Sequence, residues 1–193
     1  MTRARTMAAG AAAAAGTTLV ELLCALLIGA VLLGAALPTY QALLQGQRLR
    51  SAVADLFAAI DLTRSEALAR GATILLAPLD PAGSAWEQGW QVFADRNGNR
   101  RRDAGEELIY QHGPVADGIT IHAAFSSGTP SGYLAYNGAG RSCAADNPLA
   151  ARFGTLSLTQ GAAARNIKIN MLGRVRVCDP QVQTSGCTGL ADP

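Results

Sequence analysis

Two arginines near the C-terminus have the type and spacing of a phosphate-binding pair. Arg174 and Arg176 alternate in "GRVRVC", so both side chains point to one face if this segment is a β-strand. A guanidinium bonds phosphate oxygens in a bidentate manner, and two guanidiniums side by side can hold successive phosphates. Gly173, directly before them, allows a close backbone approach. The alternative is that both arginines pair with carboxylates of their own sheet.

The charge around this pair is one-sided. From Arg141 to Val177 the chain has a single acidic residue, Asp146, and the following basic residues: Arg141, Arg152, Arg165, Lys168, Arg174 and Arg176. The whole chain is nearly balanced, with 16 Lys and Arg against 14 Asp and Glu, so bulk charge predicts no nucleic-acid binding. We expect Lys168, Arg165 and Arg152 to supplement the arginine pair, each with a smaller effect.

A second polar cluster has the spacing of a calcium loop. In "DRNGNRRRDAGE" the first, third, fifth, ninth and twelfth positions of such a loop are held by Asp95, Asn97, Asn99, Asp103 and Glu106. The sixth position, which requires glycine, holds Arg100, and the consecutive arginines 100–102 oppose a cation. We favour a polar hairpin over calcium, and we expect neither a metal nor a cofactor.

The sequence offers no support for catalysis. It contains no HExxH, no CxxC, no phosphate-binding glycine loop and no nucleophile elbow. His112 and His122 each fall within an apparent strand and are expected to be ordinary half-buried residues. We therefore expect that the protein is not an enzyme.

Glu21 is the one charged residue in a long apolar run. The run from Thr17 to Leu37 has 21 residues and, as a helix, spans roughly the 30 Å hydrocarbon core of a bilayer. A carboxylate near the centre of a membrane helix costs about 2.5 to 3.5 kcal/mol, so Glu21 needs a partner or a task. Arg3 and Arg5 are expected to keep the N-terminus in the cytoplasm, which places the chain from about Tyr40 onward outside it.

Residues 39–71 have the pattern of an amphipathic helix that continues this span. Apolar residues recur three and four positions apart, with charged residues between them: Leu49, Val53, Leu56, Phe57, Ile60 and Ala67. Such an apolar stripe requires a surface to pack against.

Residues 72–193 are expected to form one β-rich domain that provides this surface. Short apolar or alternating runs are separated by glycines: "ATILLAPL", "WQVFAD", "ELIYQH", "GITIHAAF", "SGYLAY", "FGTLSLT", "RNIKIN" and "GRVRVC". The expected fold class is α+β, with a long N-terminal helix, membrane-spanning in its first half, packed on an antiparallel β-sheet.

The segment "GTTLVEL", from Gly16 to Leu22, resembles the prepilin signature of type IV pilins and type II secretion pseudopilins. The resemblance implies that a prepilin peptidase removes residues 1–16 as a leader and methylates the new amine of Thr17, where the family usually has phenylalanine. Residues 17–38 then form the transmembrane and filament-core helix. Glu21 is implied to pair with the N-terminal amine of a neighbouring subunit. The alternative is a signal anchor whose Glu21 lies near the lipid headgroups.

Other segments narrow the resemblance. "ARG" at 69–71, "GWQVFADRNGN" at 89–99 and "INMLGRVRVC" at 169–178 resemble the FimT and GspH branch of minor pilins and pseudopilins, most closely FimT. The Gly-Arg-x-Arg motif at Gly173 to Arg176 is similar to the FimT motif implicated in DNA binding during natural transformation. The resemblance implies a type IV pilin-like fold. It also implies an inner-membrane protein with a periplasmic domain, whose partners are other pilins or pseudopilins, the prepilin peptidase and DNA.

The four cysteines divide between the two parts of the chain. Cys24 lies in the apolar run and is expected to pack there, whereas the other three lie on the oxidising side of the membrane. We expect a disulfide between Cys178 and Cys187, because Pro180 and Gly186 between them favour a returning loop. Cys143 could compete for either partner, and the sequence does not decide between them.

Three functional hypotheses remain open at this level. The first is a minor pilin that binds DNA without sequence preference during uptake. The second is a minor pilin or a type II secretion pseudopilin that acts only in assembly. The third is an unrelated periplasmic protein with a single membrane span. Cleavage by the peptidase separates the third from the others, and DNA binding separates the first from the second.

Overall fold

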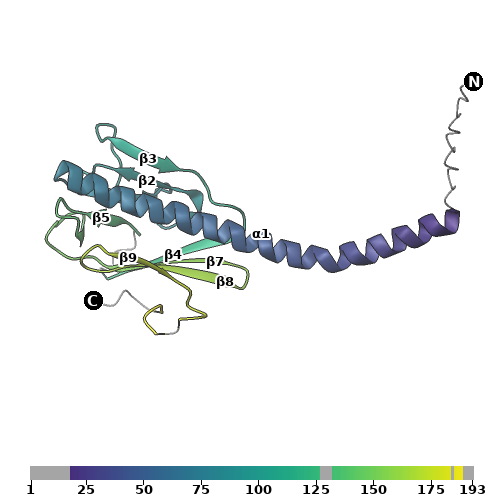
Figure 1. Cartoon of the computed structure of the whole chain (residues 1–193). Helices are drawn as coiled ribbons and strands as arrows, with labels where there is room; N and C mark the ends of the chain where they lie inside the picture. The colour runs from purple at the N-terminus through teal and green to yellow at the C-terminus, as the bar shows by residue number, and fades with distance from the viewer. Residues whose placement is uncertain (1–17, 127–131, 184, 189–193) are drawn as a thin grey trace, which may run out of the picture. The chain divides into compact units, whose positions relative to one another are not determined.

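The computed structural model describes residues 18–126, 132–183 and 185–188. The chain divides into two compact units, Met1–Ala42 and Leu43–Pro193. One long helix, α1 (Leu19–Arg70), begins in the first unit and ends in the second (Figure 1).

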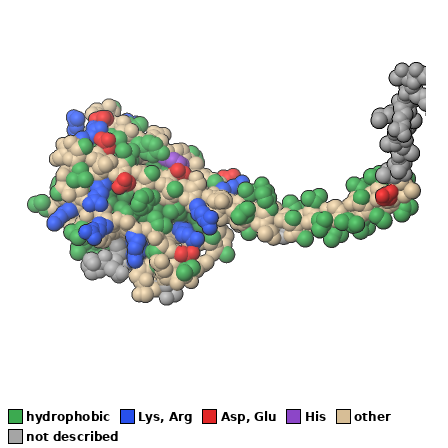
Figure 2. Space-filling model, in the orientation of Figure 1, with side chains coloured by type: hydrophobic (Ala, Val, Ile, Leu, Met, Phe, Trp, Pro, Cys, Tyr) green, Lys and Arg blue, Asp and Glu red, His purple; other side chains and the backbone are tan. Residues whose placement is uncertain are grey.

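In the first unit the described residues form the amino-terminal part of α1. Thr18 caps the helix, since its Oγ1 accepts a hydrogen bond from the Glu21 amide at 3.2 Å. The large apolar side chains that follow are exposed, and Figure 2 shows hydrophobic side chains along the visible face of this segment. Within the described part of the chain, α1 is the one helix long and apolar enough to cross a membrane, judged by length and composition.

In the second unit, α1 buries one stripe. Leu49, Leu56 and Ile60 are at most 2% exposed, and they lie on the face that the three- and four-residue spacing predicts. The helix ends at Gly71, which has a φ of 62°, and the Ala72 amide bonds back to the Ala67 carbonyl at 3.3 Å. This is the glycine-terminated C-cap that "ARG" favours.

Two antiparallel sheets complete the second unit (Figure 1). A five-stranded sheet has the order β3-β2-β1-β5-β6, and a four-stranded sheet has the order β4-β7-β8-β9. The strands are β1 (Ile74–Pro78), β2 (Trp90–Phe93), β3 (Leu108–His112), β4 (Ile119–Phe125), β5 (Leu134–Tyr136), β6 (Ser142–Cys143), β7 (Gly154–Gln160), β8 (Ala163–Ile169) and β9 (Val175–Cys178). A short 3₁₀ helix, η1 (Trp86–Gln88), precedes β2.

The main core lies between the buried stripe of α1 and the inner faces of both sheets. It includes Ile74, Leu134, Leu156 and Ile167. The five-stranded sheet carries a second, smaller cluster on its outer face, built around Phe93 and other residues that include Leu75, Tyr133 and Ala145. Because this sheet is covered on both faces, every residue of β1 is buried, which explains its continuous apolar sequence.

The α+β prediction of a long helix packed on antiparallel strands is confirmed, and each of the eight expected runs contains a strand. Two details differ. The strands form two sheets instead of one, because the inner faces of both are needed to cover the helix stripe. The two-residue strand β6 was missed because so short a segment has no periodicity to read.

Candidate nucleic-acid interface

The turn between β8 and β9 presents the arginine pair. The Asn170 side-chain oxygen accepts hydrogen bonds from the Leu172 amide at 3.1 Å and from the Arg174 amide at 2.9 Å. The Gly173 amide in turn bonds the Asn170 carbonyl at 2.9 Å. An Asn side chain that binds the backbone in this way fixes a turn locally. Arg174 is therefore held by its own backbone at a defined position.

Gly173 is required for packing. Its φ is 75°, in the left-handed region that favours glycine. A Cβ atom there would lie 2.5 Å from the Gly140 carbonyl oxygen and 2.6 Å from Cε1 of Tyr136. The buried Tyr136 hydroxyl donates to the Gly173 carbonyl at 3.2 Å. The close approach expected at this glycine is therefore made to the protein's own chain, and it holds the turn against the 137–141 turn.

Arg174 and Arg176 are both exposed and lie on the outer face of the four-stranded sheet. Val175 pairs with Ile169, which belongs to the core, so the residues on either side of Val175 point away from α1. Among the described residues, no carboxylate lies within ion-pair distance of either arginine. The structure therefore contradicts the alternative in which both arginines pair with carboxylates of their own sheet.

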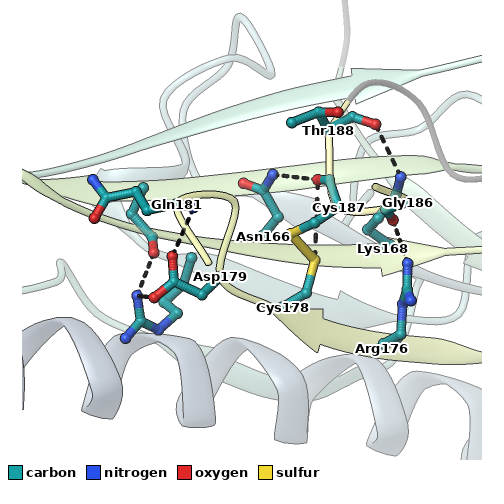
Figure 3. The surroundings of a disulfide bond; sticks show 11 residues. Asn166, Lys168, Arg176, Cys178, Asp179, Gln181, Gly186, Cys187 and Thr188 are labelled. Atoms are coloured by element: carbon teal, nitrogen blue, oxygen red, sulfur yellow. Dashed lines mark hydrogen bonds and ion pairs between the residues drawn. A yellow bond between two sulfur atoms is a disulfide. The ribbon is translucent and has the colours of Figure 1, made fainter. Parts of the chain in front are cut away.

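A disulfide closes the segment that follows β9 (Figure 3). Cys178 and Cys187 are bonded, with an S–S distance of 2.08 Å, which confirms the expected pairing. The loop returns over the outer face of the sheet, where the Asn166 side-chain amide donates to the Cys187 carbonyl at 2.7 Å. A guanidinium nitrogen of Arg176 donates to the Gly186 carbonyl, so this arginine is oriented by the loop.

Cys143 does not take part in a disulfide. It is 1% exposed within the smaller core cluster, and burial raises the pKa of its thiol to about 11. A buried thiol in an apolar environment stays protonated and unreactive at neutral pH. Cys24 is also unpaired and lies on the exposed first segment of α1.

Lys168 lies directly opposite Arg176 in the β8–β9 pair, yet it is only 4% exposed. The returning loop covers it, and its Nζ donates to the Thr188 carbonyl at 3.3 Å (Figure 3). The prediction that Lys168 adds a surface charge is therefore wrong. The local sequence placed it on the correct strand but could not show that a later segment would cover it.

Arg152 is also buried, at 1% exposure. Its guanidinium carbon lies 4.0 Å from the Tyr133 ring centre and 4.8 Å from that of Phe125, and its Nε donates to the Tyr133 carbonyl at 3.3 Å. Burial lowers its pKa, while the faces of the two rings stabilise the cation. The prediction that Arg152 contacts DNA is wrong, because the side chain is buried inside the domain against the Tyr133 and Phe125 rings.

Arg165 faces α1, on the side of the sheet opposite to Arg176. It forms an ion pair with Asp179 at 2.6 Å and donates to the Ala164 carbonyl at 2.6 Å. Together with Arg50, Phe57 and other residues it lines an apolar groove beside the helix. The structure therefore does not bring Arg165 together with the arginine pair.

Arg141 was counted in the basic segment but was not assigned to the site. It is exposed and borders a groove of about 380 Å³. The β8–β9 turn borders the same groove through Met171 and Leu172, so Arg141 lies beside the turn that precedes Arg174. Exposed apolar side chains share this groove, including Leu149 and Leu172. The signal that could have identified Arg141 is the "NGAGR" turn, since Asn137 bonds the Arg141 amide at 3.1 Å and orients the residue outward.

The 95–106 segment forms a polar hairpin between β2 and β3. The Asp95 carboxylate accepts backbone hydrogen bonds from Gly98 at 2.8 Å and Arg100 at 3.0 Å. The Glu106 carboxylate accepts those of Arg96 at 2.8 Å and Asp103 at 3.0 Å. Burial raises the pKa of Asp95 and these backbone bonds oppose that shift. The oxygens that a cation would need are thus bound to amides of the same hairpin.

At the other end of the chain, Gly16 and Thr17 lie outside the described residues. Glu21 is exposed in the first turn of α1, three positions after the Thr18 cap. An acidic side chain there interacts favourably with the helix dipole. The Thr-x-x-Glu spacing is that of a capping box, a signal that the sequence reading did not use.

Comparison with known proteins identifies the class. Residues 52–173 match the family described as Type II transport protein GspH. The chain belongs to the GspH family. The match spans the buried half of α1 and nearly all the strands, and it stops at Gly173, so Arg174 and Arg176 lie just beyond it.

A relative supports this assignment, and a solved structure shows a similar fold. The GspH-family chain is 33% identical to the pilin-like protein PilA1 of Thermus thermophilus over 165 residues, which are 84% of this chain and 97% of that protein. The fold is also similar to that of the type IV minor pilin FimU of Pseudomonas aeruginosa, with a TM-score of 0.50 and 20% identity, over 69% of this chain and 90% of that one. The predicted class of minor pilins and pseudopilins is therefore confirmed.

Proposed function

We propose that this GspH-family protein is a minor pilin of a type IV pilus that binds DNA without sequence preference during uptake. The observation that carries the proposal is the geometry of Arg174 and Arg176, two exposed guanidiniums on one sheet face with no carboxylate partner among the described residues. Such a pair suits phosphate oxygens and reads no base edge.

The assembly part of the proposal rests on the first segment of α1. A prepilin peptidase cuts after Gly16, and the chain is held in the inner membrane with its globular domain in the periplasm. Glu21 then pairs with the N-terminal amine of a neighbouring pilin, which offsets the cost of a carboxylate in an apolar environment. The exposed apolar side chains around Glu21 support this part, since they need partners that the described part of the chain does not supply.

A second candidate function is a pseudopilin of a type II secretion system, or a minor pilin that acts only in assembly. The family description, Type II transport protein, favours it. It shares the processing, the membrane anchor and the filament partners of the first proposal. It differs in having no use for DNA, so DNA binding separates the two.

The test is a titration of duplex DNA with the full chain in a neutral detergent at several salt concentrations. The native protein should bind weakly, equally for different sequences, and less as salt rises. Arg174→Gln with Arg176→Gln should weaken binding for every sequence and flatten the salt slope by roughly 2, about 0.9 for each lost contact.

The matched control is Arg48→Gln with Arg50→Gln, which removes the same charge from exposed positions of α1. It should leave the slope unchanged. Circular dichroism and an intact disulfide confirm that each variant is folded. If the native chain does not bind at low salt, or if the control and the Arg174 and Arg176 variant behave alike, the assembly-only function becomes the better assignment.

A further inference from the structure

The β2–β3 hairpin forms a concave basic site that the proposed function does not use. A pocket of about 330 Å³ lies on the outer face of the five-stranded sheet, with Ala77 and Tyr133 in its lining. Three consecutive arginines line it from the hairpin side: Arg100, Arg101 and Arg102. The turn after β1, at residues 79–83, lines it from the other side.

The acidic residues near these arginines are bound to neutral donors. Asp103 accepts the side-chain amides of Asn97 at 2.7 Å and Asn99 at 2.8 Å. Asp80, on the rim, accepts the backbone amides of Ser84 at 3.1 Å and Ala85 at 2.9 Å. Asp95 and Glu106 are buried and bonded to the hairpin backbone, so neither carboxylate occupies the guanidinium of Arg101 or Arg102.

The arginines themselves have weak partners. Arg101 donates to the Pro81 carbonyl at 3.3 Å, which joins the hairpin to the opposite rim. The guanidinium carbon of Arg100 lies 5.7 Å from the centre of the Tyr133 ring, and one of its guanidinium nitrogens lies 3.9 Å from a carboxylate oxygen of Asp146. Within the described residues, no carboxylate is at ion-pair distance from Arg101 or Arg102. Two guanidiniums at the pocket are therefore available to an anion.

The backbone supports a specific use of this loop. Arg100 has a φ of 69°, and it is the one non-glycine residue with a positive φ among those the structure describes. A left-handed conformation is strained for a non-glycine residue, and glycine would adopt it freely. The chain has an arginine at a position where glycine would be less strained, and its guanidinium lies over the Tyr133 ring in the lining of the pocket.

The pocket is connected to the arginine pair by one loop. Asp146, at one end of residues 144–151, contacts Arg100. Pro148 and Leu149, further along the loop, border the groove that also contains Arg141 and Leu172. Leu172 is two residues before Arg174. The 144–151 loop therefore contacts the hairpin through Asp146 and borders, through Pro148 and Leu149, the groove that holds Arg141 and Leu172.

We propose that the hairpin pocket is a second phosphate site, which takes the backbone of the same DNA that Arg174 and Arg176 hold. This inference rests on the proposed function and adds a second contact to it. Arg101 and Arg102 bond the phosphate oxygens, and Arg141 lies on the path between the two sites. A longer contact of this kind increases affinity through the number of phosphates neutralised, with no base readout.

The test compares variants of the full chain in neutral detergent by DNA titration at several salt concentrations. Arg101→Gln with Arg102→Gln should flatten the salt slope by roughly 2, and combining it with Arg174→Gln and Arg176→Gln should flatten it by roughly 4. Arg101→Lys with Arg102→Lys keeps both positive charges but loses the planar guanidiniums that bond phosphate in a bidentate manner. It should therefore keep the salt slope and weaken binding several-fold at each salt concentration.

The outcomes separate this inference from the proposed function. If the Arg101 and Arg102 glutamine variant binds like the native chain while the Arg174 and Arg176 variant is weakened, the second site is wrong and the function stands. If the native chain does not bind DNA, both fail. The lysine variant provides the answer should the glutamine variant not fold, because unchanged affinity would contradict bidentate phosphate binding by these arginines. The Arg48 and Arg50 glutamine control should again match the native slope.

Discussion

Helix α1 has two segments that differ both in the pattern of their apolar residues and in their burial. In the first unit its large apolar side chains are between 55 and 75% exposed, from Leu19 to Leu37. In the second unit, Leu49, Leu56 and Ile60 are at most 2% exposed, because the two sheets cover them. The apolar stripe of the second segment repeats every three to four residues, whereas the first segment is apolar on all sides.

The difference shows where each segment finds its partners. The second segment completes a core within its own chain, so its leucines stabilise the domain. The first segment has no such cover, and a helix that is apolar all round is stable only in a membrane or among other helices. In a family of minor pilins and pseudopilins, the helices of other pilins can provide such surroundings.

The largest expected effect is at Glu21. Glu21→Gln should leave the domain folded and the chain in the membrane but abolish its incorporation into filaments, because the neighbouring amine loses its partner. Immunoblotting of sheared filaments and of membranes measures both quantities. Recovery of Glu21→Gln in filaments at the native level would contradict the docking role and support the simple signal anchor.

A pair of leucine substitutions sharpens the comparison between the segments. Leu56→Ala, at a fully buried site, should lower the free energy of unfolding of the domain by about 2 to 5 kcal/mol. Leu27→Ala, in the first segment at 68% exposure, should change it by less than about 0.5 kcal/mol. Urea unfolding of the full chain in neutral detergent, followed by tryptophan fluorescence, measures both. Equal losses would mean that the first segment packs on its own domain.

Much of the fold was predictable because its signals are local. Short stretches of sequence are enough to identify the apolar first segment of α1, the three- and four-residue spacing of its second segment and the glycine that ends it. The same is true of the strands that alternate with turns. The disulfide between Cys178 and Cys187 was predictable for the same reason, since its loop is short and contains turn residues. The division of the strands into two sheets was not, because it depends on how distant segments share one core.

The candidate site was only partly predictable. The alternation of side chains along a β-strand is enough to predict that Arg174 and Arg176 lie on one face, because this prediction depends on no other strand. The burial of Lys168 depends on the loop that the disulfide closes, and that of Arg152 depends on the rings of Tyr133 and Phe125, which are distant in the sequence. In both cases the residues that bury the side chain are distant in the sequence. A count of basic residues therefore overestimates the number of positive charges at the protein surface.

The central claim is that the first segment of α1 is the processed assembly helix of a pilin-class subunit. The most direct measurement is mass spectrometry of the N-terminal peptide of the full-length gene product, recovered from a strain with a functional prepilin peptidase and from one without it. The account predicts a chain that begins at Thr17 with a methylated amine in the first strain and an uncut Met1 in the second. A mature chain that begins near Pro38, or an uncut Met1 in both strains, would contradict it.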